Sequence, residues 1–535
     1  MRLGIDFGTT SIVAAVVDRG NYPVVTFEGP GGYAPEQFPS LVALEDSSLL
    51  YGWEAWKAQE NKRATVVRSV KRFLQEAGPD TSVDIAGRRF SMLDLIGGLA
   101  QALHTALEEE SSLEVHQGEP LEVMLGVPAS ANANQRFLTV EAFERADFNV
   151  LGVLNEPSAA SIEFVHAARN RTGLPGHILI YDLGGGTFDA SLVEVEEQAH
   201  RVLASEGIAS LGGDDFDDVL AEVALEMSGI NSLEHDSLSP ADVFWLHEEC
   251  RQKKESVHPN TKVIGIDLDM VLPGWEPVFV PVAEFYRRCQ PLIDRTLRSV
   301  AHLLSQYESE VDAVYVTGGG SELPLVARAL HAAFGDCIRR SGYAHSATAI
   351  GLAIQADADS DRWLTDKMTR NFGVWREAEQ GHRVIFDALL PKGTELPAVG
   401  QSPFQVIREY QPAHNIGHFR YLECGDLQDG CEPAGDITLW DEILFPFDPA
   451  LVGSDCSAIP IRRCENACEQ VIRESYSCDS NGGITVNIAN ISAGYDRSYR
   501  LGRWAGRTNP IVLGRRYSSL KATQGSTRAA RQAGP

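Results

Sequence analysis

Basic residues are scarce in this chain, and their scarcity limits which partners it can have. Its 535 residues include 46 Lys and Arg against 74 Asp and Glu, which gives a net charge of −28 at pH 7. A protein whose main site binds nucleic acid needs a basic surface to face the phosphate backbone. The composition therefore argues against nucleic acid as the main partner.

Long apolar runs are also missing. None approaches the roughly 20 residues that a helix needs to cross a bilayer. At the N-terminus, Arg2 is followed by an apolar stretch that Asp6 interrupts, and no small-residue cleavage site follows, as a secretory signal would require. We therefore expect a cytoplasmic protein that does not bind membranes.

Cysteine is rare until late in the chain and then clusters. Six of the nine cysteines lie in one stretch: Cys424, Cys431, Cys456, Cys464, Cys468 and Cys478. They are either small buried hydrophobic residues or a metal or redox site. In a metal site, Cys464 and Cys468 would share a helical face, with Cys456, Cys478, His414 or His418 as further ligands. Zinc sites usually show tighter paired spacings, so the first interpretation is favoured.

Basic residues outnumber acidic ones at the end of the chain. From Asp496 to Pro535 there are nine Lys or Arg and one acid, so this tail carries +8 and the rest of the chain −36. Such a tail predicts a solvated, partly disordered end. Docking of the tail on a partner, or on the acidic body of the same chain, is the alternative.

The N-terminal stretch of the chain is mostly apolar, and a cluster of polar residues interrupts it. The residues DFGTTS, Asp6 to Ser11, separate two apolar runs, which predicts strand, tight turn and strand. Gly8 lets backbone N–H groups approach an anion, Thr9 and Thr10 add hydroxyl donors, and Asp6 can hold waters of Mg²⁺. Taken alone, the cluster fits an ordinary polar hairpin as well.

The same unit recurs about 176 positions later. There the apolar run His177–Tyr181 leads into DLGGGTFD, Asp182 to Asp189, and a second apolar run follows. The repeat suggests two related halves that face one ligand. A third glycine turn, TGGGSELP from Thr317 to Pro324, opens a predicted helix, as in many nucleotide sites.

These motifs carry a resemblance to a known family. DFGTTS and DLGGGTFD resemble the two phosphate motifs of actin-like ATPases, and LNEPSAAS, Leu154 to Ser161, narrows the match to the heat shock protein 70 (DnaK) chaperones. The segments VPASANANQR (127–136), SVKRFL (69–74) and LGGDDFD (211–217) are similar to family segments in the same order. The resemblance covers about residues 1–356. It implies an α/β, two-lobed actin-like ATPase domain.

The resemblance also implies roles for individual residues around ATP or ADP and Mg²⁺. Catalysis would fall to Lys71, Glu156, Asp182 and Thr187, and metal binding to Asp6, Asp182 and Asp189, with Asp189 helping to hold a monovalent cation such as K⁺. The nucleotide would contact Gly8, Thr9, Thr10, Gly184, Gly185, Gly186, Gly212, Gly213, Asp214, Lys254, Gly318, Gly319 and Gly320. Pro128 and Arg136 match the switch that relays nucleotide state to the next domain. Carboxylates, a metal, one lysine and amide-rich turns are what phosphoryl transfer needs.

Two of these residues have simpler interpretations. By spacing alone, Lys71 would be a surface lysine in the basic stretch Arg68–Arg72. Glu156, just before Pro157, would be an ordinary acid at a helix N-terminus. Only the ordered set of motifs favours the catalytic roles.

The sequence departs from the family pattern on the adenine side. Glu255 and Glu322 stand where arginines flank the base, Arg251 stands where a glutamate is expected, and His258 and Gly320 replace serines. An arginine can stack on a base, whereas a glutamate cannot. We therefore expect a weak or unusual preference for ATP.

Two further departures concern coupling. Gly152 replaces an arginine that takes part in communication with J-domain co-chaperones. The segment 355–370 offers only Trp363 and Leu364 in place of a strongly apolar linker. We expect weak control of a peptide site by nucleotide, and weak coupling to co-chaperones.

From about Asn371 the pattern changes to short apolar runs between Gly, Pro, Asn and Asp, which predicts an all-β region. SYSCDSNGGITVNIAN, Ser475 to Asn490, predicts a hairpin turning at Asn481-Gly482, and it resembles a hairpin of the DnaK peptide-binding sandwich. NFGVW (371–375) matches that domain's first strand. About 30 residues follow Trp504, too few for the helical lid of the family.

The predicted organisation is thus an ATPase domain over 1–356, a linker over 357–370, a sandwich-like polypeptide-binding domain over 371–504 and a basic tail over 505–535. The leading functional hypothesis is a slow, weakly coupled, lidless ATPase chaperone that binds non-native polypeptide. The alternative is an interaction protein on the same fold, with weak or no ATPase activity and one specific partner. LNEPSAAS and LGGDDFD argue against an actin-like filament or a sugar kinase.

Overall fold

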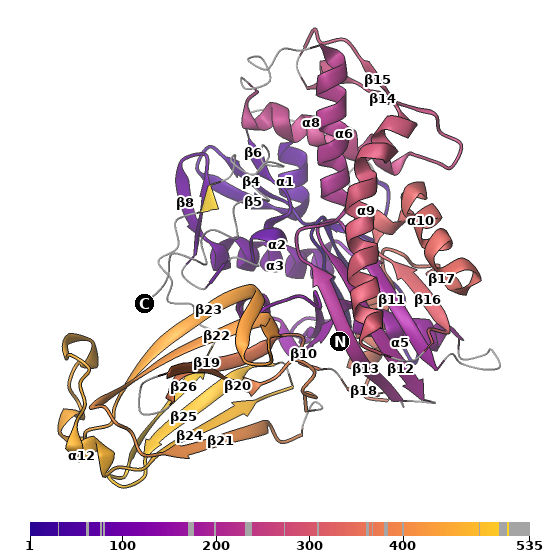
Figure 1. Ribbon diagram of the computed structural model, residues 1–535. Coiled ribbons are helices and arrows are strands. Elements are labelled where there is room, and N and C mark those ends of the chain that lie inside the picture. The colour runs from indigo at the N-terminus through magenta and orange to yellow at the C-terminus, as the bar shows by residue number, and fades with distance from the viewer. Residues whose placement is uncertain are drawn as a thin grey trace.

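Two α/β lobes of the chain share one strand arrangement (Figure 1). The computed structural model describes residues 1–29, 32–59, 64–74, 77–78, 81–168, 176–196, 199–229, 238–271, 273–307, 310–359, 363–365, 367–378, 383–397, 401–480, 482–501 and 511–512. In each lobe an antiparallel hairpin pairs in parallel with a later strand. The sheet orders are β10-β9-β1-β2-β3 in lobe I and β17-β16-β11-β12-β13-β18 in lobe II. The repeated motif therefore does mark two related halves.

The strands of lobe I are β1 (Arg2–Phe7), β2 (Ser11–Val16), β3 (Phe38–Pro39), β4 (Val42–Glu45), β5 (Ser48–Tyr51), β6 (Thr65–Val67), β7 (Ser82–Ile85), β8 (Arg88–Ser91), β9 (Glu122–Val127) and β10 (Asn149–Asn155). Its helices are α1 (Gly52–Ala58), α2 (Val70–Phe73), α3 (Met92–Glu109), α4 (Ala133–Arg145) and α5 (Glu156–Ala168).

The strands of lobe II are β11 (His177–Leu183), β12 (Phe188–Glu196), β13 (Ala199–Ile208), β14 (Val263–Ile266), β15 (Val278–Pro281), β16 (Ala313–Thr317), β17 (Ile338–Arg340) and β18 (Trp363–Thr365). Its α-helices are α6 (Gly213–Ser228), α8 (Pro240–Glu255), α9 (Val282–Ser305), α10 (Pro324–Phe334) and α11 (Ala347–Ala356). Its 3₁₀ turns are η2 (Leu268–Met270), η3 (Gly319–Glu322) and η4 (Gly335–Cys337).

The two lobes are joined by close packing around α11. A Cβ on Gly4 of β1 would lie 2.1 Å from the backbone N of Ala353, and one on Gly351 would lie 1.8 Å from the carbonyl oxygen of Ala159 in α5. A larger residue at position 4 would separate α11 from β1, and a larger residue at position 351 would separate α11 from α5. Strands of both lobes share one core here, with buried side chains that include Ala15 and Ile180.

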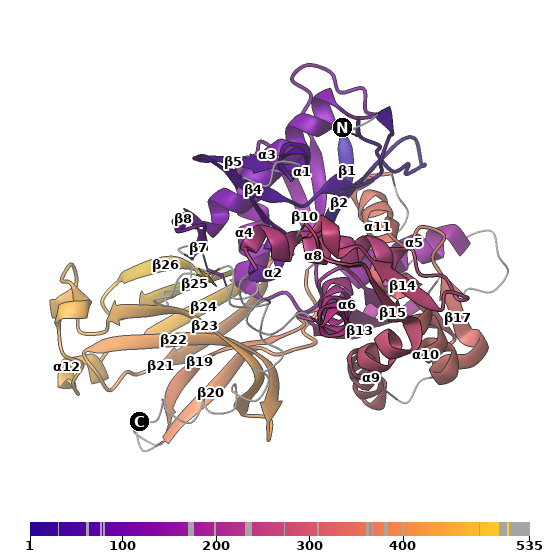
Figure 2. The ribbon, with the colours of Figure 1, turned by 90° about the horizontal axis from the view of Figure 1, so that it is seen from above.

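The C-terminal region is the expected β-sandwich, and it lies to one side of the two lobes (Figure 2). One sheet has the order β20-β19-β22-β23 and the other β21-β24-β25-β26. Its strands are β19 (Asn371–Ala378), β20 (Arg383–Leu390), β21 (Phe404–Tyr410), β22 (Ile416–Gln428), β23 (Glu432–Pro446), β24 (Ile472–Cys478), β25 (Ile484–Asn490) and β26 (Tyr495–Leu501). Between β23 and β24 lie η6 (Pro449–Leu451), η7 (Cys456–Ala458) and α12 (Glu465–Cys468).

The predicted hairpin is formed by β24 and β25, although Asn481 of its turn lies outside the described residues. A buried ion pair joins the two sheets: the guanidinium of Arg376 donates to both carboxylate oxygens of Glu474, at 3.0 and 2.6 Å. Glu474 is fully buried, so removal of Arg376 would leave a buried carboxylate without its cation. Arg376 also donates to Asp387 at 2.7 Å.

The segment expected to be a linker contributes β18, which pairs in parallel with β13 at the edge of the lobe II sheet. Of the basic tail, the structure describes only Ile511 and Val512, which form β27 (Ile511–Val512) beside β7. The rest of the predicted tail lies outside the described residues.

The clustered cysteines follow neither interpretation completely. Cys424, Cys456 and Cys478 are buried, as expected of small hydrophobic residues, and Cys464 is half-buried, but Cys431 and Cys468 are exposed. Within the described ranges, no three His, Cys, Asp or Glu side chains come together as a metal site would require. The metal site is therefore wrong for these residues; His414 and His418 lie beside Glu377 and Glu442 instead.

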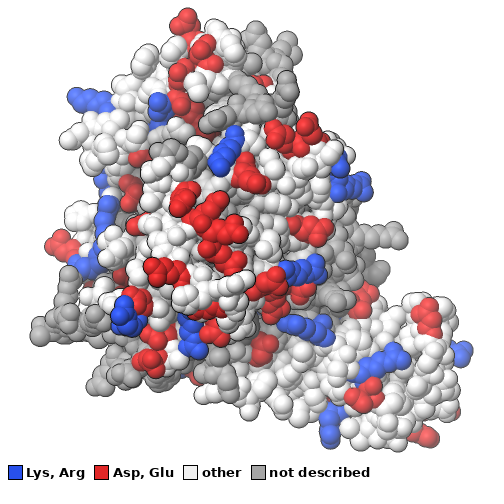
Figure 3. Space-filling view, turned by 180° about the vertical axis from the view of Figure 1, so that it is seen from behind, with Lys and Arg blue, Asp and Glu red and all other residues white. Residues whose placement is uncertain are grey.

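Acidic side chains gather in the middle of the face seen in Figure 3, over the two lobes. Among the described helices, none is long and apolar enough to span a membrane.

Candidate functional site

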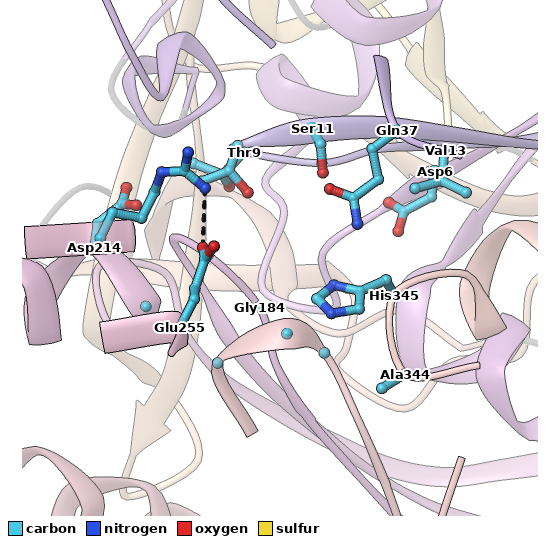
Figure 4. A pocket seen from close by; sticks show the side chains of 18 of the residues that line it. Asp6, Thr9, Ser11, Val13, Gln37, Gly184, Asp214, Glu255, Ala344 and His345 are labelled. Atoms are coloured by element: carbon cyan, nitrogen blue, oxygen red, sulfur yellow. Dashed lines mark hydrogen bonds and ion pairs between the residues drawn. The ribbon is translucent and has the colours of Figure 1, made fainter. Parts of the chain in front are cut away.

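A cavity of about 660 Å³ lies between the two lobes, where the three glycine turns meet. Of the predicted site residues, its lining includes Asp6, Gly8, Thr9, Thr10, Lys71, Glu156, Asp182, Gly184, Gly185, Thr187, Gly213, Asp214, Lys254, Gly318, Gly319 and Gly320. Gly186, Asp189 and Gly212 are not among the residues that line it. In Figure 4, Asp6, Gln37 and His345 turn toward the same space.

The two hairpin turns touch each other across the cleft. A Cβ on Gly185 would lie 2.7 Å from the Cγ2 of Thr10, and one on Gly186 would lie 2.6 Å from the Cγ2 of Thr9. The glycines of the lobe II turn are therefore needed for the approach of the lobe I threonines. Together the turns present backbone N–H groups and hydroxyls from both lobes, which suits an anion.

The third turn closes the site beside Asp182. Gly318 has φ +82°, a conformation that L side chains rarely adopt, and a Cβ there would lie 2.4 Å from the Oδ1 of Asp182. Behind Gly185, a Cβ on Gly212 would lie only 2.5 Å from the carbonyl oxygen of Gly185. The Nζ of Lys254 fixes this region, since it donates to the Gly213 carbonyl at 2.8 Å and pairs with Asp217 at 2.8 Å.

Lys71 is a buried cation rather than a surface lysine. It is 4% exposed, and its Nζ donates to the Oε1 of Glu156 at 2.6 Å. Burial lowers the pKa of Lys71, but Glu156 and Asp6 raise it further than burial lowers it, so Lys71 stays charged. Glu156 is the first residue of α5, as its sequence context predicts.

The carboxylates around Lys71 carry more negative charge than one lysine balances. Burial, together with Glu156, raises the pKa of Asp6 to about 7 and that of Asp189 to about 7. Burial and the same carboxylates raise the pKa of Asp182 well above its usual value. Such a cluster fits a site completed by a bound cation, because a nearby positive charge would favour the ionised carboxylates.

The donor set suits Mg²⁺ held mostly through water. In the described part of the chain, no three acidic, Cys or His side chains form a direct cage. Magnesium usually takes one or two carboxylates and completes its shell with waters and phosphate oxygens. Asp6 and Asp182 are placed for that role. Asp189, 1% exposed, lies behind the turn and accepts from the backbone N–H of Ser130 at 3.1 Å.

The short helix α2, which carries Lys71, is clamped between the lobes. Ser69, just before it, has φ +57°, which is strained for a serine, and its Oγ donates to Asp214 at 2.6 Å. Arg72 donates to the carbonyl oxygen of Gly186 at 3.2 Å and to Asp215 at 2.5 Å. These lobe II contacts hold α2 in place, and with it Lys71, at the cavity.

A family model described as Hsp70 protein matches residues 2–371. The chain belongs to the Hsp70 family. Related chaperones include chaperone protein HscA of Proteus mirabilis, 28% identical, with 99% of this chain and 82% of that protein covered. An HscA homolog of Chromobacterium violaceum is 29% identical, with 78% and 68% covered, and one of Haemophilus influenzae is 28% identical, with 82% and 70% covered.

Arg251, Glu255 and Glu322, three of the residues that depart from the Hsp70 pattern, line the cavity. Arg251 donates to Glu248 at 2.7 Å and to Glu255 at 2.9 Å, the latter contact drawn in Figure 4. Glu322 faces His345 at 3.2 Å. His258 is not part of the lining.

Several lining residues were not predicted. Arg68 of lobe I pairs with Glu248 of lobe II and stacks on Phe244, with its Cζ 5.1 Å from the ring centre, so that it bridges the cleft. His345 and Gln37 also line the cavity. No sequence motif surrounds His345 or Gln37. For Arg68 the only indication is the basic stretch Arg68–Arg72, which was interpreted through Lys71 alone.

The predicted switch residues lie between the cavity and the sandwich. Pro128 begins the loop before α4, and Ser130 of this loop contacts Asp189. Arg136 of α4 donates to the side chain of Asn155. On the other side, the backbone N–H of Ala133, the first residue of α4, donates to Glu423 of the sandwich. The loop therefore contacts the carboxylate cluster, and the start of α4 that follows it contacts the C-terminal region.

Proposed function

We propose that this protein is an ATP-hydrolysing Hsp70-type chaperone that binds non-native polypeptide and works with Mg²⁺. The observation that carries the proposal is the buried Lys71–Glu156 pair, set between two phosphate-type turns and beside the carboxylates Asp6 and Asp182. An apolar side chain would fill this buried position with a smaller desolvation penalty than a charged lysine. The charge of Lys71 therefore indicates a functional role.

The residues divide the work of phosphoryl transfer between them. The turns at Thr9–Thr10 and Gly184–Gly185 would bind the phosphates through N–H and hydroxyl donors. Lys71 would orient the attacking water and stabilise charge on the transferred group, while Glu156 holds its ammonium in place. Thr187 lines the same wall as Gly184 and Gly185. Positioning and charge neutralisation of this kind supply most of the catalysis in this reaction class.

Asp6 and Asp182 would hold Mg²⁺ through water, and Asp189 would help to hold K⁺. When bound, the metal neutralises phosphate charge. Without it, the carboxylates of this wall would oppose a triphosphate.

The sandwich is the region we propose for polypeptide binding. The outer face of its β20-β19-β22-β23 sheet carries exposed apolar side chains: Val384 is 51% exposed, Ile437 45% and Leu439 59%. Ile437 and Leu439 are two positions apart on β23 and share this face, and neighbouring exposed apolar side chains on a sheet are typical of surfaces that bind extended chains. Without a lid, exchange of polypeptide is expected to be fast.

Coupling between the site and the sandwich is expected to be weak, and so is coupling to J-domain co-chaperones. Gly152 lies within β10, at a bulge between Val150 and Gly152, and offers no side chain for such contacts. The cytoplasm is the compartment we propose, because the exposed cysteines Cys337, Cys431 and Cys468 are free thiols, which a reducing compartment preserves.

Single-turnover hydrolysis of ATP with Mg²⁺ tests the proposal, with and without unfolded polypeptide, in the wild type and in Lys71→Ala. We expect the wild type to turn over slowly and to accelerate with polypeptide. Lys71→Ala should lose about a hundredfold in rate while still binding nucleotide. An unchanged rate in the variant would refute the role of Lys71. Inert hydrolysis by the wild type, with one stable co-purifying partner, would favour an interaction protein on this fold.

A further inference from the structure

The C-terminal tail returns from the sandwich to lobe I. β27 pairs in parallel with β7, with Ile511 opposite Val83 and Val512 opposite Asp84. β7 and β8 alone form an antiparallel hairpin, so β27 adds a third strand and gives the sheet the order β27-β7-β8. In Figure 1, β27 is the isolated yellow arrow beside β8. A segment from the end of the chain is therefore paired with a strand of the first lobe.

The edge of β7 is suited to bind an extended chain. The side chains of Val83 and Ile85 are fully buried in the core of lobe I, which fixes the strand from inside the lobe. On one side the backbone of β7 pairs with β8, and on the other side β27 is its only partner among the strands that the structure describes. An unpaired strand edge presents free N–H and C=O groups, which another strand can satisfy. This edge therefore recognises the backbone of a short extended segment.

The sequence of the tail contains one segment that suits this edge. The run Ile-Val-Leu at 511–513 is the only run of three such apolar residues in 502–535. Isoleucine and valine favour the extended conformation. Pro510 precedes the run, and proline is tolerated at the start of a strand, whereas Gly514 follows it, and glycine weakens a strand. The run is thus a short strand former in a tail that is mostly polar, basic or small.

The chain between the sandwich and β27 is short. β26 ends at Leu501, and only nine residues, 502–510, separate it from Ile511. Because an extended chain gains at most about 3.6 Å per residue, the steps from Leu501 to Ile511 cover no more than about 36 Å. The end of β26 must therefore stay within that distance of β7 while β27 is paired.

The strand that leads into this connection also contacts lobe I. The guanidinium carbon of Arg500, on β26, lies 5.8 Å from the ring centre of Phe137 on α4. α4 is also the helix whose first N–H, at Ala133, donates to Glu423 of the sandwich. The tail thus continues an interface that the sandwich and lobe I already share, and it extends that interface from α4 to β7.

We propose that the edge of β7 is the docking site of the chain's own tail, and that β27, paired there, fastens the sandwich to lobe I. The ladder is short, but the connection through 502–510 makes the pairing intramolecular. A flexible linker of this length keeps the tail at a millimolar effective concentration, which supports a contact too weak to form between separate molecules. This inference concerns how the regions of the chain are joined, and it does not depend on the proposed ATPase activity.

Hydrogen–deuterium exchange of the full chain tests both parts of the inference. In Ile511→Pro/Val512→Pro, the tail loses two backbone donors and no longer pairs as a strand. The N–H groups of β7 that point away from β8 should then exchange at least about fivefold faster than in the wild type. The N–H of Ala133 should exchange at least about threefold faster, because the sandwich spends more time away from α4. Ser518→Pro/Ser519→Pro, a second pair of prolines in the same tail, is the matched control and should exchange like the wild type at both places.

Each outcome decides one part of the inference. Exchange of β7 that is equal in the wild type and in Ile511→Pro/Val512→Pro would show that the tail does not occupy this edge. Faster exchange of β7 with no change at Ala133 would show that β27 docks without fastening the sandwich, and would overturn the second part. Sedimentation of the wild type identifies the source of the strand. A monomer supports the inference, whereas a dimer whose β7 protection falls on dilution would mean that the tail of a second copy is bound, and would overturn it.

Discussion

The backbone N–H of Ala133 donates a 3.0 Å hydrogen bond to the carboxylate of Glu423. Ala133 begins α4 of lobe I, and Glu423 lies on β22 of the sandwich, 290 positions later. An acid at the N-terminus of a helix is stabilised by the free N–H groups and the helix dipole. Here that acid is supplied by another region of the chain, so it helps to cap α4 only while the sandwich is docked.

Glu423→Ala should therefore loosen the docking of the sandwich. Glu423 is 3% exposed, also accepts from the indole N–H of Trp440, and lies 3.9 Å from Arg370. Breaking a buried charge pair of this kind costs about 3 kcal/mol. Limited proteolysis and small-angle scattering should show a more extended and more easily cleaved molecule. Glu432→Ala, at an exposed glutamate on β23, is the control; equal behaviour of the two variants would contradict the docking role of Glu423.

This contact shows where prediction from the sequence ends. The turns at Asp6–Ser11 and Asp182–Asp189 were predictable from their own residues. Glycines, threonines and an acid between apolar runs indicate a tight turn between strands, and they are also the groups that bind anions and metal ions. Lys71 was predictable only through a family motif, because its neighbours alone suggest a surface lysine. Glu423 has no such local mark: it is a single acid in a strand, and its partner is fixed by how two regions pack.

The same limit applies to the contacts around the cavity. Arg68 and Glu248 are 180 positions apart and belong to different lobes. The exposure of Cys431, in the turn between β22 and β23, and of Cys468, in α12 between β23 and β24, likewise depends on how these segments pack, which cysteine spacing does not encode. Periodicity and turn residues predict elements, whereas the pairing of distant charges depends on their packing in three dimensions.

Leu439→Asp should weaken the binding of unfolded polypeptide. Leu439 is 59% exposed on the outer face of β23, beside Leu422 of β22 in the strand register. Loss of one apolar contact and the addition of a charge should reduce affinity about tenfold, measured by fluorescence anisotropy with a labelled peptide. Ile407→Asp makes a similar change, from an exposed aliphatic residue to Asp, at a side chain that is 53% exposed on the other sheet. If Ile407→Asp weakened binding as much as Leu439→Asp, the outer face of the β20-β19-β22-β23 sheet would not be the binding surface.

Arg68→Ala should speed the release of bound nucleotide. The side chain crosses from lobe I to Glu248 on α8 and stacks on Phe244, so it helps to hold the lobes together over the cavity. Glu248 keeps its contact with Arg251 in the variant, which limits the loss of stability. The dissociation rate of a fluorescent ADP analogue should rise about tenfold, as expected from the loss of one partly buried pair. Arg298→Ala, at an exposed arginine on α9, should not change the rate, and an unchanged rate in Arg68→Ala would rule out the bridge as a barrier to release.

Asp189→Asn should stabilise the nucleotide-free protein, and more so at higher pH. Burial and Glu156 raise the pKa of Asp189 to about 7, whereas in the unfolded chain it titrates near 3.8. The folded state therefore holds this proton more tightly, and its contribution to stability is lost as pH rises from about 4 to about 7. Above that range the ionised carboxylate costs on the order of 4 kcal/mol, which the amide avoids.

Urea unfolding without nucleotide and with Mg²⁺ chelated measures this difference. Asp189→Asn should match the wild type near pH 4 and exceed it increasingly up to pH 8, while Asp46→Asn, at an exposed aspartate, should show no such trend. With Mg²⁺ and ATP present, the wild type should gain more stability than Asp189→Asn, because bound cations favour the ionised carboxylate. A difference between the two proteins that does not vary with pH would mean that Asp189 is not held protonated by its surroundings, and that the carboxylate cluster does not require a cation.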